Sequence, residues 1–117
     1  MQPQITPEWI MQTVATGKPF TLLLLVNGKA LPKDQMEAGQ LQMGHLTHLF
    51  TLEREGKASI FGPISNNEKY GGLIIFNTVD KEQIKEWMAE DPFVKGGHFT
   101  YELLDWFTIP GQKIPIG

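Results

Sequence analysis

Two short apolar runs constrain the fold of this chain more than any other feature: LLLLV at residues 22–26 and LIIF at residues 73–76. Each run is too short for a typical helix and shows no alternation of polar and apolar residues. Each therefore predicts a strand that is buried on both faces. Two further strands are predicted at 57–61 and 98–107, where polar and apolar residues are mixed, which suits the edges of a sheet.

Helices are predicted between these strands. One runs from about residue 33 or 34 to residue 55, where Gly56 ends it. The other begins at Asp80, which forms a pattern with Gln83 that resembles a capping box. Two glycines, at positions 39 and 44, weaken the longer helix locally by about 1 kcal/mol each relative to alanine.

A short helix is also predicted before the first strand, over residues 7–16. Thr6 suits its N-cap, and a proline occupies the first helical position. Trp9, Ile10 and Val14 lie on roughly one side of this helix. We therefore expect that side to dock on another surface.

The order after this first helix is βαββαβ. Right-handed crossovers and a hairpin between the second and third strands favour an α+β, ferredoxin-like fold with an antiparallel sheet. Its two helices would cover one face, and the apolar opposite face would be buried in a homodimer. The leading helix is an alternative cover for part of that face. The expected organisation is an N-terminal helical extension (1–19), a ferredoxin-like domain (20–108) and an irregular tail (109–117).

The composition narrows the function classes. The chain has 117 residues, a net charge of −3 and no cysteine. No dense run of lysine or arginine occurs, which argues against partners such as nucleic acid or an anionic membrane. Absence of cysteine excludes disulfides, thiolate metal sites and cysteine nucleophiles. We expect a cytoplasmic protein, because no signal peptide is apparent and the apolar runs are too short to span a bilayer.

The stretch GHLTHLF, residues 44–50, places two histidines inside the longer predicted helix. In helical projection, His45 falls among leucines on the face toward the sheet, and His48 falls at the border with the polar face. A buried imidazole without a partner costs about 1–3 kcal/mol, so His45 needs a hydrogen bond or a wet cavity. The alternatives are a structural histidine, a catalytic one, or a metal-binding pair. The last is disfavoured because no third ligand is apparent nearby.

Asp91 raises a similar choice. It precedes Pro92, and helical backbone is disfavoured before proline. This pattern predicts an N-cap, with Pro92 opening a new helical turn. Such a cap does not exclude a second role, and the spacing alone leaves open whether Asp91 comes near His45.

Two segments carry a resemblance to a known family: HLTHLFTLEREGKASIFGP at 45–63 and, after a strand that begins with Gly-Gly, WMAEDPF at 87–93. This order and spacing resembles the YciI-like (YCII-related) family. The resemblance implies a homodimer of the dimeric α/β barrel type and a His–Asp pair, here His45 and Asp91, proposed as a catalytic dyad. The family's catalytic relatives include lyases that eliminate chloride from chlorinated hydroxyquinol-type aromatics. Muconolactone isomerases and small monooxygenases belong to the wider superfamily.

Three hypotheses follow. The first is an acid–base lyase or isomerase without metal or cofactor, in which His45 transfers a proton and Asp91 orients its ring. A small substrate, such as an aromatic molecule, would bind in an apolar pocket beside these residues, formed by His48, Phe61, Gly62, Pro63 and Phe93. Core packing and turn geometry are the competing explanation for Phe61, Gly62, Pro63 and Phe93, and a solvated or half-exposed position is the competing explanation for His48.

The second hypothesis is a non-catalytic dimeric domain that binds a small molecule or a partner protein. In it, the His45–Asp91 hydrogen bond is structural. The third is a monooxygenase or haem-binding protein with His98 as a ligand, against which stands the interpretation of His98 as a solvated strand residue.

Overall fold

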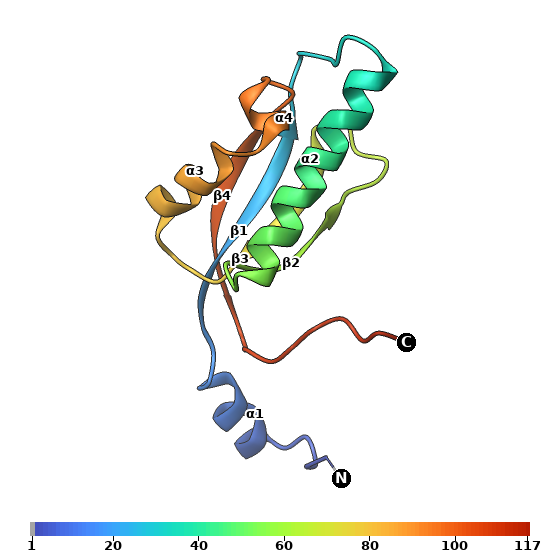
Figure 1. Ribbon diagram of the computed structural model, residues 1–117. Coiled ribbons are helices and arrows are strands. Elements are labelled where there is room, and N and C mark those ends of the chain that lie inside the picture. The colour runs from blue at the N-terminus through green and yellow to red at the C-terminus, as the bar shows by residue number, and fades with distance from the viewer. Residues whose placement is uncertain (1) are drawn as a thin grey trace.

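The computed structural model describes residues 2–117, and its eight elements follow the predicted order (Figure 1). They are α1 (Pro7–Val14), β1 (Lys18–Asn27), α2 (Gln35–Arg54), β2 (Ala58–Pro63), β3 (Tyr70–Phe76), α3 (Lys81–Met88), α4 (Pro92–Lys95) and β4 (Phe99–Thr108). The four strands form one antiparallel sheet in the order β2-β3-β1-β4. The predicted α+β, ferredoxin-like fold is therefore confirmed, with the two most apolar strands in the centre.

Short polar side chains begin the helices, as the sequence predicts. Thr6, Asp34 and Asp80 each accept a hydrogen bond from a backbone N–H in the first turn of α1, α2 and α3. Such caps satisfy donors that have no partner within the helix. Because these signals are local, the predicted helix starts agree with the structure to within one or two residues.

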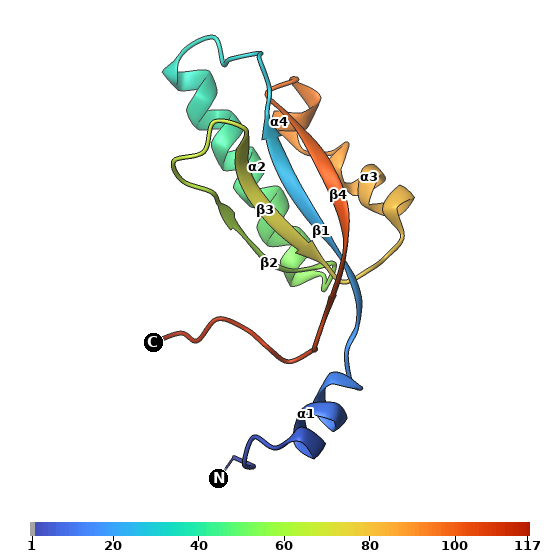
Figure 2. The same cartoon turned by 180° about the vertical axis from the view of Figure 1, so that it is seen from behind.

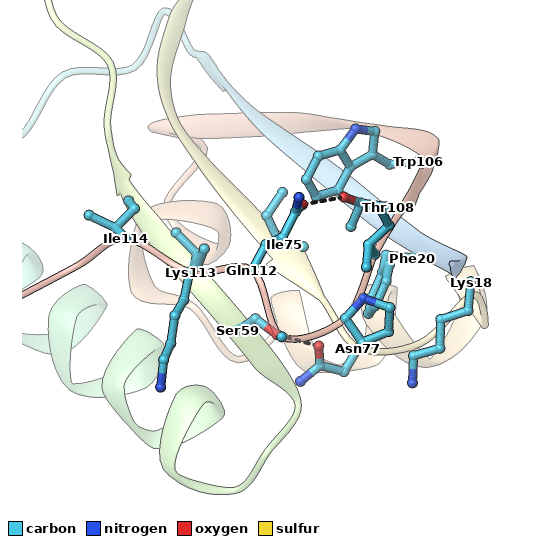
Figure 3. Close-up of a pocket in the computed structure, with 14 residues that line it drawn as sticks. Lys18, Phe20, Ser59, Ile75, Asn77, Trp106, Thr108, Gln112, Lys113 and Ile114 are labelled. Carbon is cyan, nitrogen blue, oxygen red and sulfur yellow. Dashed lines mark hydrogen bonds between the residues drawn. The ribbon is translucent and has the colours of Figure 1, made fainter. Parts of the chain in front are cut away.

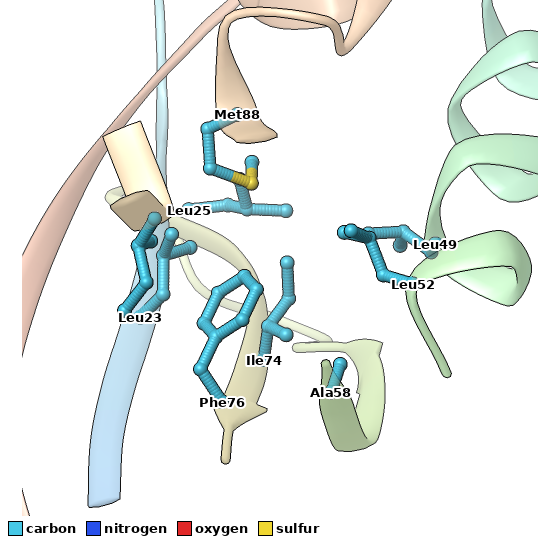
Figure 4. Packing of buried hydrophobic residues seen from close by; sticks show 9 residues of the cluster. Leu23, Leu25, Leu49, Leu52, Ala58, Ile74, Phe76 and Met88 are labelled. Carbon is cyan, nitrogen blue, oxygen red and sulfur yellow. The ribbon is translucent and has the colours of Figure 1, made fainter. Parts of the chain in front are cut away.

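The hydrophobic core lies between one face of the sheet and α2, α3 and the short α4 (Figures 1 and 2). Alternate residues of β1 and β3 point toward the helices, since successive side chains of a strand point to opposite faces. Figure 4 shows the packing of this cluster. Its members include Leu23, Leu25, Leu49, Leu52, Ile74, Phe76, Ile84 and Met88.

The opposite face of the sheet, called the open face below, carries the other alternate residues. Leu22 of β1 pairs in register with Ile75 on one side and with Leu104 on the other. No helix of residues 2–117 lies over this face (Figure 2). Part of the C-terminal tail, residues 109–114, lines a cavity with open-face residues at one end of the sheet.

The N-terminal helix α1 does not cover the open face. It lies beyond the end of the sheet, and none of its residues 7–14 is buried (Figures 1 and 2). The docking surface expected for its apolar side is therefore not found within residues 2–117 of the same chain.

No helix in that part of the chain has both the length and the apolar character needed to cross a membrane.

Candidate functional site

The structure brings both histidines of α2 to one carboxylate. Asp91, which is fully buried, accepts hydrogen bonds at Oδ2 from His45 Nδ1–H at 2.7 Å and from His48 Nδ1–H at 3.2 Å. Its other oxygen, Oδ1, accepts from the backbone N–H of Phe93 at 2.9 Å. Asp91 thus caps α4, as the sequence predicts, and also binds two side chains from α2.

These donors decide the charge of Asp91. Burial on its own raises the pKa of the carboxyl, but the hydrogen bonds from His45 and His48, the charge of His45 and the Phe93 N–H together hold its pKa well below the ordinary range. Asp91 is therefore ionised. An ionised carboxylate only accepts hydrogen bonds, so Nδ1 carries the proton in both imidazole rings.

Gly44 explains how α2 comes so near α4. A Cβ on Gly44 would lie 2.9 Å from Cγ of Pro92, closer than such atoms approach in practice. Glycine therefore permits the close contact of the two helices that puts His45 and His48 on Asp91. From the sequence, Gly44 is expected only to weaken the helix locally, and its position directly before His45 is the one sequence signal of this second role.

His45 lines a cavity of about 300 Å³ between α2 and the ends of the central strands. That volume lies at the lower end of the range for small-molecule sites. Four of the predicted pocket residues share this lining with His45, namely Phe61, Gly62, Pro63 and Phe93. His48 does not line the cavity and contacts Asp91 instead.

Aromatic rings hold His45 in place. The Phe93 ring lies edge-on to the imidazole, with centroids 5.1 Å apart, and the Phe99 ring lies at 6.1 Å. The two phenylalanine rings contact each other at 5.2 Å. An imidazole between two phenyl rings and a carboxylate has little rotational freedom, which suits either a pre-organised base or a structural hydrogen bond.

His98 takes no part in this arrangement. Its Nδ1 is bonded to the backbone carbonyl of Ala30 at 2.8 Å, so it connects the segment after β1 to the turn before β4. The side chain is partly buried, and it lies on the Phe93 ring at a centroid distance of 5.9 Å. Among residues 2–117, no group of three or more histidine, aspartate or glutamate side chains has the arrangement that a metal ion needs.

The sequence matches one known protein family. A model of the YCII-related domain matches residues 22–107, about three quarters of the sequence. The chain belongs to this family. In this YCII-related protein, the matched region includes α2, the cavity lining and Asp91, whereas α1 lies outside it. None of the curated proteins matches the sequence.

Two solved structures are similar to this YCII-related protein. One is 5-chloro-2-hydroxyhydroquinone dehydrochlorinase from Burkholderia phenoliruptrix AC1100, in complex with 2,5-dihydroxybenzoquinone, with 19% identity and a TM-score of 0.53 over 74% of this chain and 92% of that one. The other is muconolactone isomerase, with 14% identity and a TM-score of 0.61 over 82% of this chain and 96% of that one. At these identities, the resemblance shows the fold.

Proposed function

We propose that this protein is a small acid–base enzyme, a lyase or isomerase, in which His45 accepts a proton from a small hydroxylated or carbonyl-bearing ring. The observation that carries the proposal is that His45 contacts a buried carboxylate on one side and a cavity on the other. Its Nδ1–H is fixed by buried, ionised Asp91, while its side chain lines an apolar cavity. A general base needs this combination of a fixed tautomer and access to substrate.

The chemistry follows from that tautomer. With Nδ1 protonated, Nε2 of His45 keeps its lone pair and accepts the proton that the substrate loses. The resulting imidazolium is stabilised by Asp91, which remains negatively charged. In a lyase, the substrate then expels an anion such as chloride, and the proton leaves to solvent. In an isomerase, the proton returns to a different atom of the same molecule.

His48 is assigned a positioning role in this proposal. Its bond to Oδ2 of Asp91 is the longer of the two, and its side chain does not line the cavity. It restrains the carboxylate through Oδ2, whereas the backbone cap at Phe93 uses Oδ1. Phe61 and Phe93 supply apolar walls for a flat ring, which supports an aromatic or quinonoid substrate class.

The similar structures supply probes for a test. We would measure chloride release from 5-chloro-2-hydroxyhydroquinone and binding of 2,5-dihydroxybenzoquinone by the full chain and by His45→Gln. The proposal expects turnover to fall by about 100-fold or more in His45→Gln, the loss typical of removing a general base. His98→Gln is the matched control, because it makes the same replacement outside the cavity and should retain turnover.

Nitrogen-15 NMR of the imidazole rings tests the dyad without a substrate. In the wild type, His45 should hold its proton on Nδ1, and Asp91→Asn should change the distribution of the proton between its two ring nitrogens. An unchanged tautomer of His45 would rule out the orienting role of Asp91.

The alternative is a non-catalytic binding domain in which the same hydrogen bonds only join α2 to α4. The complete burial and full hydrogen bonding of Asp91 favour it. It predicts that His45→Gln lowers the melting temperature, that the shift caused by 2,5-dihydroxybenzoquinone is unchanged, and that neither protein releases chloride.

A further inference from the structure

Helix α1 is a folded, apolar element that buries none of its residues against the rest of residues 2–117. Thr6 caps it by accepting a hydrogen bond from the Trp9 N–H, and the Thr13 hydroxyl donates to the Trp9 carbonyl. None of its eight residues is buried, and the side chains of Ile10 and Val14 are 44% and 51% exposed. An isolated helix of this length is marginal in water, so its stability requires packing against another surface.

The segment that joins α1 to β1 keeps the helix away from its own domain. It consists of residues 15–17 only, and the N–H groups of Thr16 and Gly17 donate back to the last carbonyls of the helix. Gly17 lies against the ring of Phe107, where a Cβ would collide with ring carbons. These contacts make the end of α1 and residues 15–17 one ordered unit that lies against Phe107.

The dimensions of the molecule agree with an arm that extends from it. The Cα radius of gyration is 17.0 Å, and the extents are 56 × 33 × 27 Å. A compact chain of this length has a radius of gyration of about 13 Å. Helix α1 lies beyond the end of the sheet in both views and contributes to this excess, as does the C-terminal tail (Figures 1 and 2).

An apolar cavity lies at the same end of the sheet as α1 (Figure 1). This cavity of about 600 Å³, called the tail cavity below, lies between the open face and residues 109–114 (Figure 3). Phe20, Ile75 and Trp106 give it an apolar floor. It is larger than the cavity beside His45 and lies on the opposite face of the sheet.

The charges of the two surfaces are complementary. The lining of the tail cavity includes Lys18 and Lys113 and, among the described residues, no carboxylate. Glu8 in the first turn is the charged residue of α1. An apolar helix with one carboxylate therefore matches an apolar cavity with two lysines at its rim.

We propose that α1 of one protomer docks in the tail cavity of a second copy of the chain, and that the second copy docks its α1 in return. Both the arm and its receptor are present on every chain, so a two-fold pair satisfies both at once. The tail cavity is continuous with the open face, so the same pairing covers exposed residues such as Leu104. The cavity is incomplete without the partner's helix.

Cross-linking between chains tests this placement. The protein has no cysteine, so Ile10→Cys on α1 and Ile114→Cys on the tail are single reactive sites in the full chain. One variant is labelled with nitrogen-15, the two are mixed, and a short flexible bismaleimide is added. Mass spectrometry should find the mixed covalent dimer in high yield. Met36→Cys replaces Ile114→Cys as the control, because it lies on α2 and should give little mixed product.

Two results would overturn the proposal. If the double variant Ile10→Cys/Ile114→Cys forms an internal cross-link in a monomer, α1 docks on its own chain. If the mixture gives no more product than the Met36→Cys control, α1 does not dock in the tail cavity, and any partner it has is a different molecule. Circular dichroism checks that each variant keeps its fold.

A charge placed on α1 gives an independent measurement. Ile10→Asp puts a carboxylate on the apolar side, and sedimentation equilibrium of the full chain should show the dimer dissociation constant raised about tenfold or more. Gln12→Asp adds the same charge on the polar side of the same helix and should leave the constant within about twofold of the wild type. Equal effects of the two variants would contradict the docking of this side of α1.

Discussion

The same strands form the two faces of the sheet, but the two faces differ in how completely their side chains are buried. Against the helices, Leu23 and Phe76 are fully buried. Buried Asp91 on this side has a hydrogen-bond donor for each of its oxygens. On the open face, Leu104 and Trp106 keep 43% and 41% of their surface exposed. Helices of the same chain cover the first face, whereas no helix of residues 2–117 covers the second (Figure 2).

This difference in burial suits the two faces to different roles. The helix-covered side holds a charged group out of water, which requires a complete set of hydrogen bonds and close packing. The proposed chemistry lies there. The open face exposes apolar area without any buried charge, which is the property of a surface that meets another molecule. The homodimer expected from the sequence stays a prediction, and the proposed exchange of α1 is one way to realise it.

The largest expected effect is on the covered side, at Asp91. We expect Asp91→Ala to lower the free energy of unfolding by about 3–5 kcal/mol, because the buried imidazole of His45, the half-buried imidazole of His48 and a backbone N–H lose their acceptor. Asp80→Ala removes another N-cap aspartate, one that is exposed, and should cost about 1 kcal/mol. Urea unfolding measures both. Equal losses would show that the hydrogen bonds from α2 contribute little.

Acid unfolding sharpens the same test. Because the pKa of Asp91 is lowered in the folded protein, the unfolded chain takes up this proton first as the pH falls. The stabilisation is present above the ordinary aspartate pKa of about 4 and is lost below it. Asp91 adds up to about 1.4 kcal/mol per pH unit to the slope of stability in that acid range. Asp91→Ala should lack this contribution.

Two adjacent leucines of β4 test the contrast between the faces directly. Leu103 packs against the core, and Leu104 lies on the open face. We expect Leu103→Ala to cost about 2 kcal/mol of unfolding free energy and Leu104→Ala less than about 1 kcal/mol. Urea unfolding at low protein concentration keeps association out of the comparison. A larger loss at Leu104 would mean that the open face is already covered under those conditions.

The smallest effect concerns two glycines of α2. Gly44→Ala forces a Cβ against Pro92, whereas a Cβ on Gly39 meets nothing within 4 Å. We expect Gly44→Ala to lose about 1 kcal/mol net, because crowding outweighs the better helix propensity of alanine. Gly39→Ala should gain about 0.5–1 kcal/mol. Thermal unfolding of both variants gives the sign, and stabilisation by Gly44→Ala would contradict the need for close contact between α2 and α4.

Some features of the site were out of reach of sequence reasoning. The helical projection directs His45 toward the sheet, and the buried position of that side chain agrees with it. The same projection put His48 at a half-exposed border and did not anticipate its bond to a residue 43 positions away. Such contacts depend on the distance between α2 and α4, and the periodicity of one helix carries no information about that distance.

What the sequence by itself determined is everything set by neighbours along the chain. Two apolar runs defined the central strands, aspartates and a threonine fixed the helix starts, and the order of elements left one compact topology. Only the tertiary structure decided that Asp91 meets both histidines, that Gly44 makes room for Pro92, and that α1 stands apart from its own domain. Those outcomes depend on the packing distance between elements far apart in sequence, where a shift of about 1 Å separates a hydrogen bond from none.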